Sequence, residues 1–270
     1  MKYSIVINVF KRTQFINRAI QSCQRLTKNE NDEIEIIVVS DYNIPNDSIK
    51  KIFSTESAVG YRYALGLKEA TGDWIMLLDD DDYFLPDKLK LFSMVEYYNF
   101  PAMIKEYGKY HKGILRDHFK DIELEETMTL RDVIKKHIDW HISEYSFNQK
   151  FKDRLLENNM KKVNVSLDKF IFANGLSETG GSYACENLQT FITYHSNSRM
   201  HSMNKQEKKA FYIKTAEMIG NISPTNISLG YLDYNYKLNM FLATGNKEYF
   251  NEIKYNMPFV NRLYYKFRRQ

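Results

Sequence analysis

The strongest constraint on the fold is an alternation of apolar and helical segments in about the first ninety residues. Short apolar stretches at 3–9, 34–39 and 73–78 are rich in branched residues and predict buried strands. Helical periodicity at 14–26 and 62–71 predicts the helices that connect them. Near-continuous apolar strands joined by helices indicate parallel strands covered on both faces. We therefore expect an α/β fold built on a mostly parallel sheet.

Weaker patterns give the remaining elements. Further helices are expected at 47–53, 128–138, 150–160, 205–219 and 231–255, and one that Pro86 opens. Asn46 or Asp47 is expected to cap the helix at 47–53, and Gly72 to close the one at 62–71. Residues 165–173 fit a strand or a helix, 188–194 read as a strand, and Gly175, Gly180 and Gly181 indicate a loop.

Composition excludes several classes of protein. Of the 270 residues, 43% are hydrophobic and 27% charged, which is ordinary for a soluble globular chain. No apolar run approaches the roughly 20 residues that span a bilayer, and the N-terminus lacks a signal-peptide layout, so a cytoplasmic protein is expected. The net charge of +4 does not call for nucleic acid. Cys23 and Cys185 lack metal-ligand spacing and are expected to be buried free thiols.

Polar clusters follow each of the three predicted strands, at residues 8–12, 41–43 and 79–82. In open α/β sheets, ligands bind beyond the carboxyl ends of the strands. These clusters therefore predict one ligand site at that edge of the sheet.

Four consecutive aspartates, Asp79 to Asp82, are the strongest chemical feature. They repel one another, and no basic residue is nearer along the chain than Lys88. A hard divalent cation, Mn(II) or Mg(II), relieves that repulsion and prefers carboxylate oxygens. Because side chains at i and i+2 of an extended turn point the same way, Asp79 and Asp81 can face one ion. The alternative is a solvated acidic turn or a helix cap, which applies above all to Asp82.

The aspartate run resembles the D-x-D region of family-2 glycosyltransferases, the inverting enzymes of the GT-A fold. Residues 77–89 carry this likeness, and residues 8–12, 37–41 and 65–75 resemble three further segments of the family in the same order. Asn8 stands where the family usually has proline, Lys11 where it has asparagine, and Ser40 where it has an acid. The resemblance covers roughly residues 3–92 and implies a Rossmann-like sheet that binds a nucleotide-sugar donor.

The resemblance implies roles on the donor side. Asp41 would accept a nucleobase N–H, Phe10 would pack beside the base, and Arg62 would reach the diphosphate or ribose. The remaining implied nucleotide contacts are Asn8, Arg12 and Asp80, and the implied metal ligands are Asp79, Asp81 and His195. The donor expected is a UDP- or dTDP-sugar. Simpler interpretations are a turn-forming Asp41, a core Phe10, a surface Arg62 and a structural His195.

An inverting transfer also needs a general base. The spacing to the family's C-terminal motif, which residues 186–198 resemble, selects Asp168, with Glu178 and Glu186 as rivals and a helix cap as the simpler interpretation. Trp140 and His141 fall where the family's acceptor side begins, so they are candidate acceptor contacts, or a core tryptophan beside an exposed histidine. A hydroxyl of a glycan or lipid-linked molecule is the expected acceptor.

This interpretation divides the chain into a catalytic domain at 1–203 and a helical extension at 204–270. The catalytic domain comprises a nucleotide-sugar-binding half at 1–100 and an acceptor-binding half at 101–203. The basic, aromatic tail at 258–270 suggests peripheral contact with an anionic membrane, or a packed helical end; flotation of the chain on liposomes with and without the tail separates the two.

Two rival functions follow from the same residues. The lack of the family's usual Glu-Asp pair before Asp168 fits a decayed nucleotide-sugar-binding scaffold protein. A nucleotidyltransferase would want a glycine-rich phosphate loop after the first strand, but residues 8–12 contain no glycine.

Overall fold

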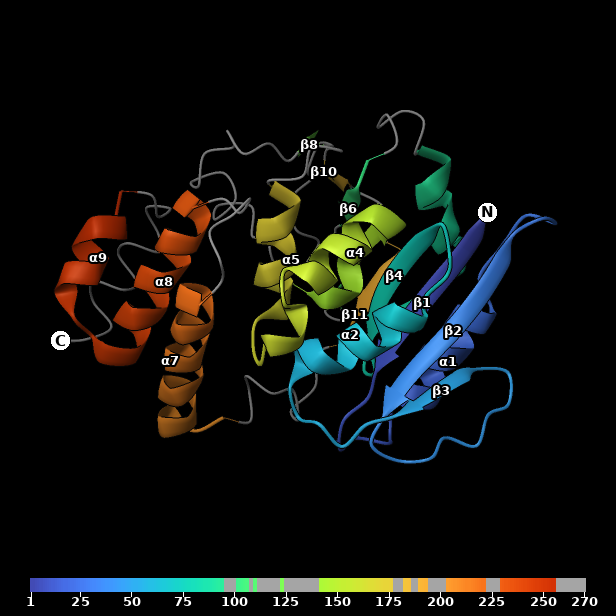
Figure 1. Ribbon diagram of the computed structural model, residues 1–270, viewed down its shortest axis with the longest axis horizontal. Helices are drawn as coiled ribbons and strands as arrows, with labels where there is room; N and C mark the ends of the chain where they lie inside the picture. Colours follow the sequence, from blue (N-terminus) through green and yellow to red (C-terminus); the bar gives the residue numbers. More distant parts are fainter. Residues whose placement is uncertain are drawn as a thin grey trace.

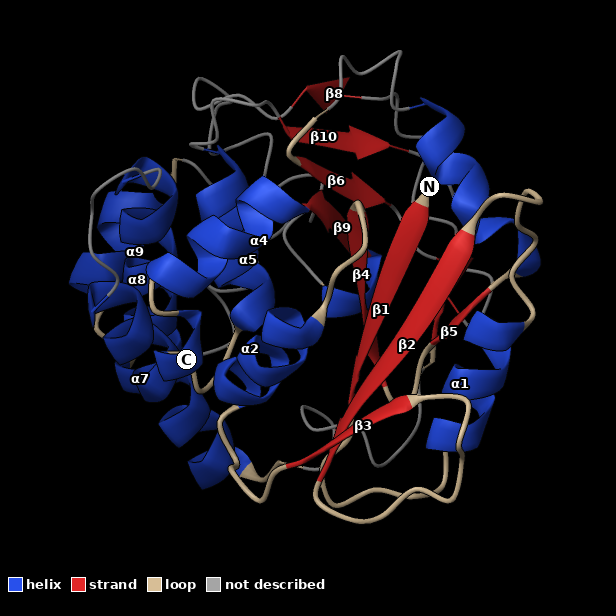
Figure 2. Ribbon diagram, turned by 45° about the vertical axis from the view of Figure 1, so that its right-hand side comes forward, coloured by secondary structure: helices blue, strands red, loops and turns tan. Residues whose placement is uncertain are grey.

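The computed structural model describes residues 1–94, 101–106, 109–110, 122–123, 141–176, 182–185, 189–193, 203–221 and 229–255. Eight of the described strands form one sheet (Figures 1 and 2). In spatial order they are β3 (Lys50–Phe53), β2 (Glu33–Ser40), β1 (Lys2–Asn8), β4 (Trp74–Asp79), β9 (Tyr145–Asn148), β6 (Met103–Glu106), β10 (Ser182–Cys185) and β8 (Ile122–Glu123). The strands β3, β2, β1 and β4 are parallel, whereas β9 and β8 run antiparallel to their neighbours. The mostly parallel α/β sheet expected from the sequence is confirmed.

Helices cover both faces of this sheet. One face packs on α1 (Ile16–Gln24) and the 3₁₀ helix η1 (Pro86–Met94), and the other on α2 (Val59–Glu69), α4 (Gln149–Glu157) and α5 (Leu167–Leu176) (Figure 2). The pleat of β1 divides its side chains between the two layers, since Ile5 and Ile7 join the α1 side while Val6 joins the α2 side. All three are fully buried, which explains why these strands read as continuous apolar runs.

A second, three-stranded sheet lies against the carboxyl end of the main one. It contains β5 (Tyr83–Phe84), β11 (Thr190–Ile192) and β7 (Lys109–Tyr110). The short 3₁₀ helix η2 (Ile142–Glu144) contacts both β4 and β11, so it bridges the two sheets. A second one, η3 (Met160–Lys162), packs against α2.

The C-terminal helices α7 (Lys205–Asn221), α8 (Leu229–Thr244) and α9 (Lys247–Ile253) gather at one end of the molecule, beyond α5 (Figure 1). Ile219 of α7 and Leu232 of α8 belong to the same hydrophobic cluster as Val6 of the sheet. The division of the chain at residue 203 stays a prediction. Within its described residues, the chain has no helix with both the length and the apolar character that a membrane crossing requires.

Three sequence predictions are corrected. Residues 50–53 form the strand β3, not part of a helix at 47–53, because the open edge of β2 offers backbone partners and Asn46 makes a local turn in which the Ser48 N–H donates to its Oδ1 at 3.0 Å. The single helix expected at 231–255 is divided into α8 and α9 at Gly245, whose φ is 76°. Gly175 lies in α5 and not in a loop: a Cβ there would stand 2.3 Å from Met103 Cε, so the helix lies close against β6 at this point.

Other predictions were right in type and inexact in extent. The ambiguous stretch at 165–173 is helical, as α5, and the strand expected at 188–194 is the shorter β11. Helix α2 ends at Glu69, so Gly72 is no helix cap; its N–H donates to Ser4 Oγ at 2.7 Å at a close approach to β1. Cys23 is buried, as expected. The helix expected at 128–138 lies outside the described residues.

Candidate metal and nucleotide-sugar site

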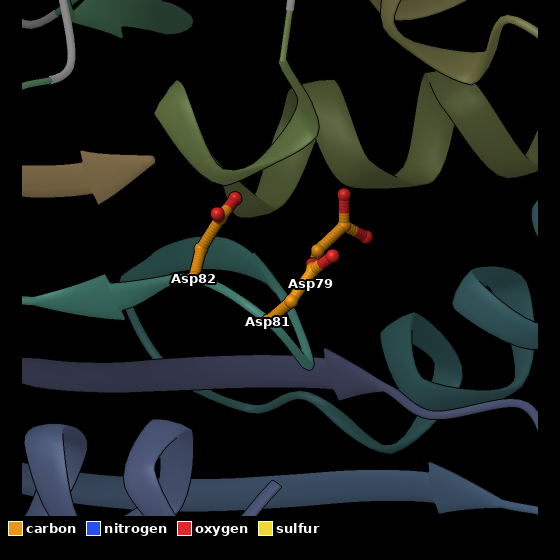
Figure 3. A group of neighbouring side chains, drawn as sticks. All are labelled: Asp79, Asp81 and Asp82. Carbon is orange, nitrogen blue, oxygen red and sulfur yellow. The ribbon is translucent and has the colours of Figure 1, made fainter. Parts of the chain in front are cut away.

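The aspartate run forms a tight turn at the carboxyl end of β4. The Asp82 N–H donates to the Asp79 carbonyl oxygen at 3.2 Å, which closes the turn. Figure 3 shows the side chains of Asp79, Asp81 and Asp82 leaving this turn towards one side. Each offers a carboxylate oxygen, and these oxygens lie within 4.8 Å of one another. Three convergent hard oxygen ligands are the donor set that Mg(II) and Mn(II) prefer.

Asp79 is held from the α2 side. The Tyr63 hydroxyl, on a fully buried side chain, lies 2.9 Å from Asp79 Oδ1. Burial first, and the neighbouring Asp81 charge second, raise the pKa of Asp79 to about 7. The ionised form of Asp79 is thus disfavoured, and a bound cation would stabilise it.

Asp80 is not a member of this group and pairs with Arg12. Its Oδ1 accepts a hydrogen bond from Arg12 Nη2, while Arg12 Nη1 donates to Asp81 Oδ2 at 2.8 Å. Burial raises the pKa of Asp80 to about 6, although the Arg12 charge opposes the shift. Its second oxygen, Oδ2, is buried and accepts no hydrogen bond in the part of the chain that the structure describes.

Asp82 is a buried member of the group. The sequence pattern did not single out Asp82 as a metal ligand. Its Oδ2 accepts from the Ser143 hydroxyl at 2.7 Å, and its Oδ1 from the Thr193 N–H at 2.9 Å. Burial, followed by the Asp81 charge, raises the pKa of Asp82 well above its usual range. The four-aspartate run contained the signal for Asp82, whereas Ser143 and Thr193 are 61 and 111 residues away along the chain.

Parallel pairing brings the three polar clusters to one edge, as predicted. Asn8 is in register with both Val39 of β2 and Asp79 of β4. Asp41 follows directly after β2, and its carboxylate accepts the Lys11 N–H at 3.1 Å and 3.2 Å. The Lys11 backbone turns sharply there, with φ 58°. The segment after β1 is therefore tied to the segment after β2.

Arg62 is tied by hydrogen bonds to other residues of the chain. Its side chain is completely buried, and its Nε donates to Asn8 Oδ1 at 2.6 Å. The other guanidinium bonds reach backbone carbonyl oxygens of Val39 at 3.1 Å, Ser54 at 3.2 Å and Glu56 at 3.3 Å. These four hydrogen bonds tie the guanidinium to the chain itself, so its expected contact with the diphosphate or ribose stays a prediction. Arg62 supports Asn8, and its Cζ lies 4.6 Å from the centroid of the Phe10 ring.

The structure describes two of the six remaining candidates, Asp168 and His141. Asp168 is half-buried in the first turn of α5, where its Oδ1 accepts the Lys169 N–H at 3.0 Å. His141 is half-buried and precedes η2 with φ 61°, two residues before Ser143. Trp140, His195 and the rival bases Glu178 and Glu186 lie outside the described residues. The roles of all six stay predictions.

Comparison with known proteins agrees with this geometry. Residues 4–104 match the model of glycosyl transferase family 2. An uncharacterized glycosyltransferase of Nostoc sp. is 31% identical over 103 residues, which are 33% of this chain and 31% of that protein. The uncharacterized glycosyltransferase YwdF of Bacillus subtilis is 34% identical over 100 residues, 33% of this chain and 36% of that protein. The matched region thus spans about a third of these relatives' length.

Solved structures share the fold over nearly the whole chain. TarS 1–349 of S. aureus, in complex with UDP-GlcNAc, aligns over 97% of this chain and 80% of its own, with TM-score 0.63 and 14% identity. The mannosyltransferase PcManGT of Pyrobaculum calidifontis, in complex with GDP-Man and Mn²⁺, aligns over 94% of this chain and 75% of its own, with TM-score 0.56 and 11% identity. Together with the aspartate turn after β4, these likenesses show that residues 4–104 are similar to glycosyl transferase family 2 and that the chain has the GT-A fold.

Proposed function

We propose that this chain is an inverting glycosyltransferase that depends on a divalent metal. It transfers a sugar from a nucleoside-diphosphate donor, a UDP- or dTDP-sugar, to a hydroxyl group of a glycan or lipid-linked acceptor. The observation that carries the proposal is the convergence of three carboxylates within 4.8 Å at the carboxyl end of β4, beside Asn8. The donors named for the solved neighbours, UDP-GlcNAc and GDP-Man, support a nucleotide-sugar of this class.

The donor set fits Mn(II) or Mg(II). Asp79, Asp81 and Asp82 would hold the ion, with His195 as a further candidate ligand. When bound, the metal supplies positive charge to the diphosphate leaving group. The raised pKa values of Asp79 and Asp82 support this assignment, because a cation would favour the carboxylate form that burial disfavours.

The chain's own residues have separate tasks in this proposal. Asp41 accepts the ring N–H of the nucleobase, and Phe10 packs beside the base. When Asp81 binds the metal, Arg12 releases Asp81 and donates a guanidinium N–H to the diphosphate. The ion pair with Asp80 keeps the guanidinium close to the site. Arg62 supports Asn8 through a hydrogen bond and Phe10 through contact with its ring. Asp168 accepts the proton of the acceptor hydroxyl on a carboxylate oxygen, and Trp140 and His141 line the acceptor side.

Calorimetric titration of UDP with and without Mn(II) tests the donor site. We expect metal-dependent binding that Asp81→Ala abolishes and that Asp47→Ala, a fully exposed aspartate after β2, leaves unchanged. Binding of dTDP or GDP in place of UDP would correct the nucleotide and keep the site. If no nucleoside diphosphate binds in the presence of Mn(II), the proposal is refuted.

Turnover tests the base separately. Asp168→Asn removes the proton acceptor and keeps the shape, so we expect transfer to fall by about 10²–10⁴-fold with donor binding retained. An unchanged rate would reject Asp168 as the base. Donor binding without transfer to any acceptor by the unmodified chain would favour the decayed scaffold.

A further inference from the structure

A single buried hydroxyl joins the first and last residues of the aspartate run. Ser143 has no exposed surface. Its Oγ accepts the Asp79 N–H at 2.9 Å and donates to Asp82 Oδ2 at 2.7 Å. The backbone bond between Asp82 and Asp79 closes the same turn. Ser143 therefore fixes both the path of the turn and the direction in which the Asp82 carboxylate points.

The partners of Asp82 leave its charge unmatched. Both of its hydrogen-bond donors, the Ser143 hydroxyl and the Thr193 N–H, are neutral groups. Across the ranges that the structure describes, no basic side chain forms an ion pair with Asp82. A buried carboxylate is costly without a counter-charge, yet each of its oxygens keeps a second lone pair for a ligand. One of its oxygens lies within 4.8 Å of carboxylate oxygens of Asp79 and Asp81, so one cation could serve all three.

Buried polar contacts hold the segment that carries Ser143. Glu144, the next residue, is fully buried and forms an ion pair with the equally buried Lys105 of β6. The Glu144 N–H also donates to the His141 carbonyl oxygen at 3.3 Å. Because a buried ion pair anchors η2 on the main sheet, the Ser143 hydroxyl has a fixed position against β4.

We propose that Ser143 is a positioning residue that orients Asp82 as a metal ligand. This inference rests on the proposed function, since it concerns the ion that the aspartates hold. It assigns to the acceptor-side half of the chain a direct part in shaping the donor-side metal site. Partners of this kind fix the direction of a ligand and raise the affinity of the site for its metal.

The test is Mn(II) affinity, measured by electron paramagnetic resonance of the free ion in the presence of UDP. The variants are Ser143→Ala, Asp82→Asn and the double variant. Ser146→Ala is the matched control, because Ser146 is equally buried on the adjacent strand β9 and its Oγ makes no hydrogen bond within the described structure. Ser143→Cys keeps a weaker donor at the same position. Circular dichroism establishes that each variant is folded.

We expect Ser143→Ala to weaken Mn(II) binding about 10-fold, Ser143→Cys to weaken it less, and Ser146→Ala to leave it within about 2-fold. In the Asp82→Asn background, Ser143→Ala should weaken Mn(II) binding by less than about a further 2-fold, because the two residues act as one unit.

Unchanged affinity in Ser143→Ala, or losses that multiply in the double variant, would overturn the inference. If Asp82→Asn binds Mn(II) normally while Asp81→Ala does not, the metal site stands and only the inference fails. If the unmodified chain binds no Mn(II) with UDP, the proposed function itself fails.

Discussion

At the scale of single residues, the site is a set of carboxylates whose charges are only partly matched. Arg12 serves Asp80 and Asp81, while Asp79 and Asp82 receive hydrogen bonds from neutral groups alone among the contacts above. The pKa values follow this division, since burial raises that of Asp79 to about 7 and that of Asp82 well above its usual range. In the metal-free chain, burial thus favours the protonated form of the two carboxylates that would hold a cation in the proposed enzyme.

This protonation predicts a dependence of stability on pH. The pKa of Asp79 is about 7 in the folded chain, whereas the usual value for an exposed aspartate is 3.8. Between these two pH values the folded state therefore binds more protons than the unfolded state. Through this group, stability is expected to fall as pH rises from about 4 through about 7. We expect the thermal midpoint of the metal-free chain to decrease across this window by several degrees, at roughly 2–4 °C per kcal/mol. Added Mn(II) should raise the midpoint, and more so at higher pH.

The control is Asp79→Asn, which keeps the shape and cannot titrate. Scanning calorimetry of both proteins from pH 4 to pH 8 compares the two slopes. A shallower slope in Asp79→Asn supports the assignment, whereas parallel slopes would place the titrating group elsewhere.

At the scale of elements, α2 is positioned by its glycines. A Cβ at Gly66 would lie 2.3 Å from Val6 Cγ1 and 3.2 Å from Val39 Cγ2, so the helix packs directly on β1 and β2. The same helix carries Arg62 and Tyr63, which hold Asn8 and Asp79. The distance between α2 and the sheet therefore sets the position of two site residues.

Gly66→Ala should accordingly destabilise the protein. Helix propensity alone favours alanine by about 1 kcal/mol, but an added methyl in a packed interface costs about 1–3 kcal/mol. We expect a net loss in the free energy of unfolding, measured in urea, together with weaker UDP binding. Lys68→Ala, at an exposed position of the same helix, is the control. A variant as stable as the parent would show that α2 can move away from the sheet without cost.

The elements also show what the sequence could predict. The strands β1, β2 and β4 and helices α1 and α2 follow from local apolar periodicity, because each buries its own continuous run or face. Strand β3 does not, since Lys50 and Lys51 are exposed and only the open edge of β2 makes the segment extended. In the site, the convergence of Asn8 with Asp79 followed from parallel topology, while the burial of Arg62 depended on carbonyl oxygens that no local pattern reveals.

At the scale of the whole molecule, buried charges connect segments that are distant in the chain. Lys88 of η1 and Glu106 of β6 are both fully buried and form an ion pair. Thr190 of β11 hydrogen-bonds to both, at 3.0 Å from Lys88 Nζ and 102 residues away from it in sequence. This cluster joins the main sheet to the second sheet. Such pairings are invisible to sequence periodicity, because charged residues usually indicate a surface.

Lys88→Met should therefore destabilise the protein far more than a substitution at an exposed position of the same 3₁₀ helix. Removing one partner leaves Glu106 as an unmatched buried charge, at a cost of about 3–5 kcal/mol in the free energy of unfolding. Lys90→Met is the matched control: its ammonium pairs with Asp87 on the surface, where ion pairs contribute little. Replacing both charges, as Lys88→Met with Glu106→Leu, should recover most of the loss, because no charge then stays buried. Urea unfolding of the parent and the three variants measures these free energies.

If Lys88→Met and Lys90→Met are equally stable, the ion pair is not what holds the two sheets together. If the double replacement is less stable than Lys88→Met alone, the cluster acts through its shape and hydrogen bonds and not through its charges.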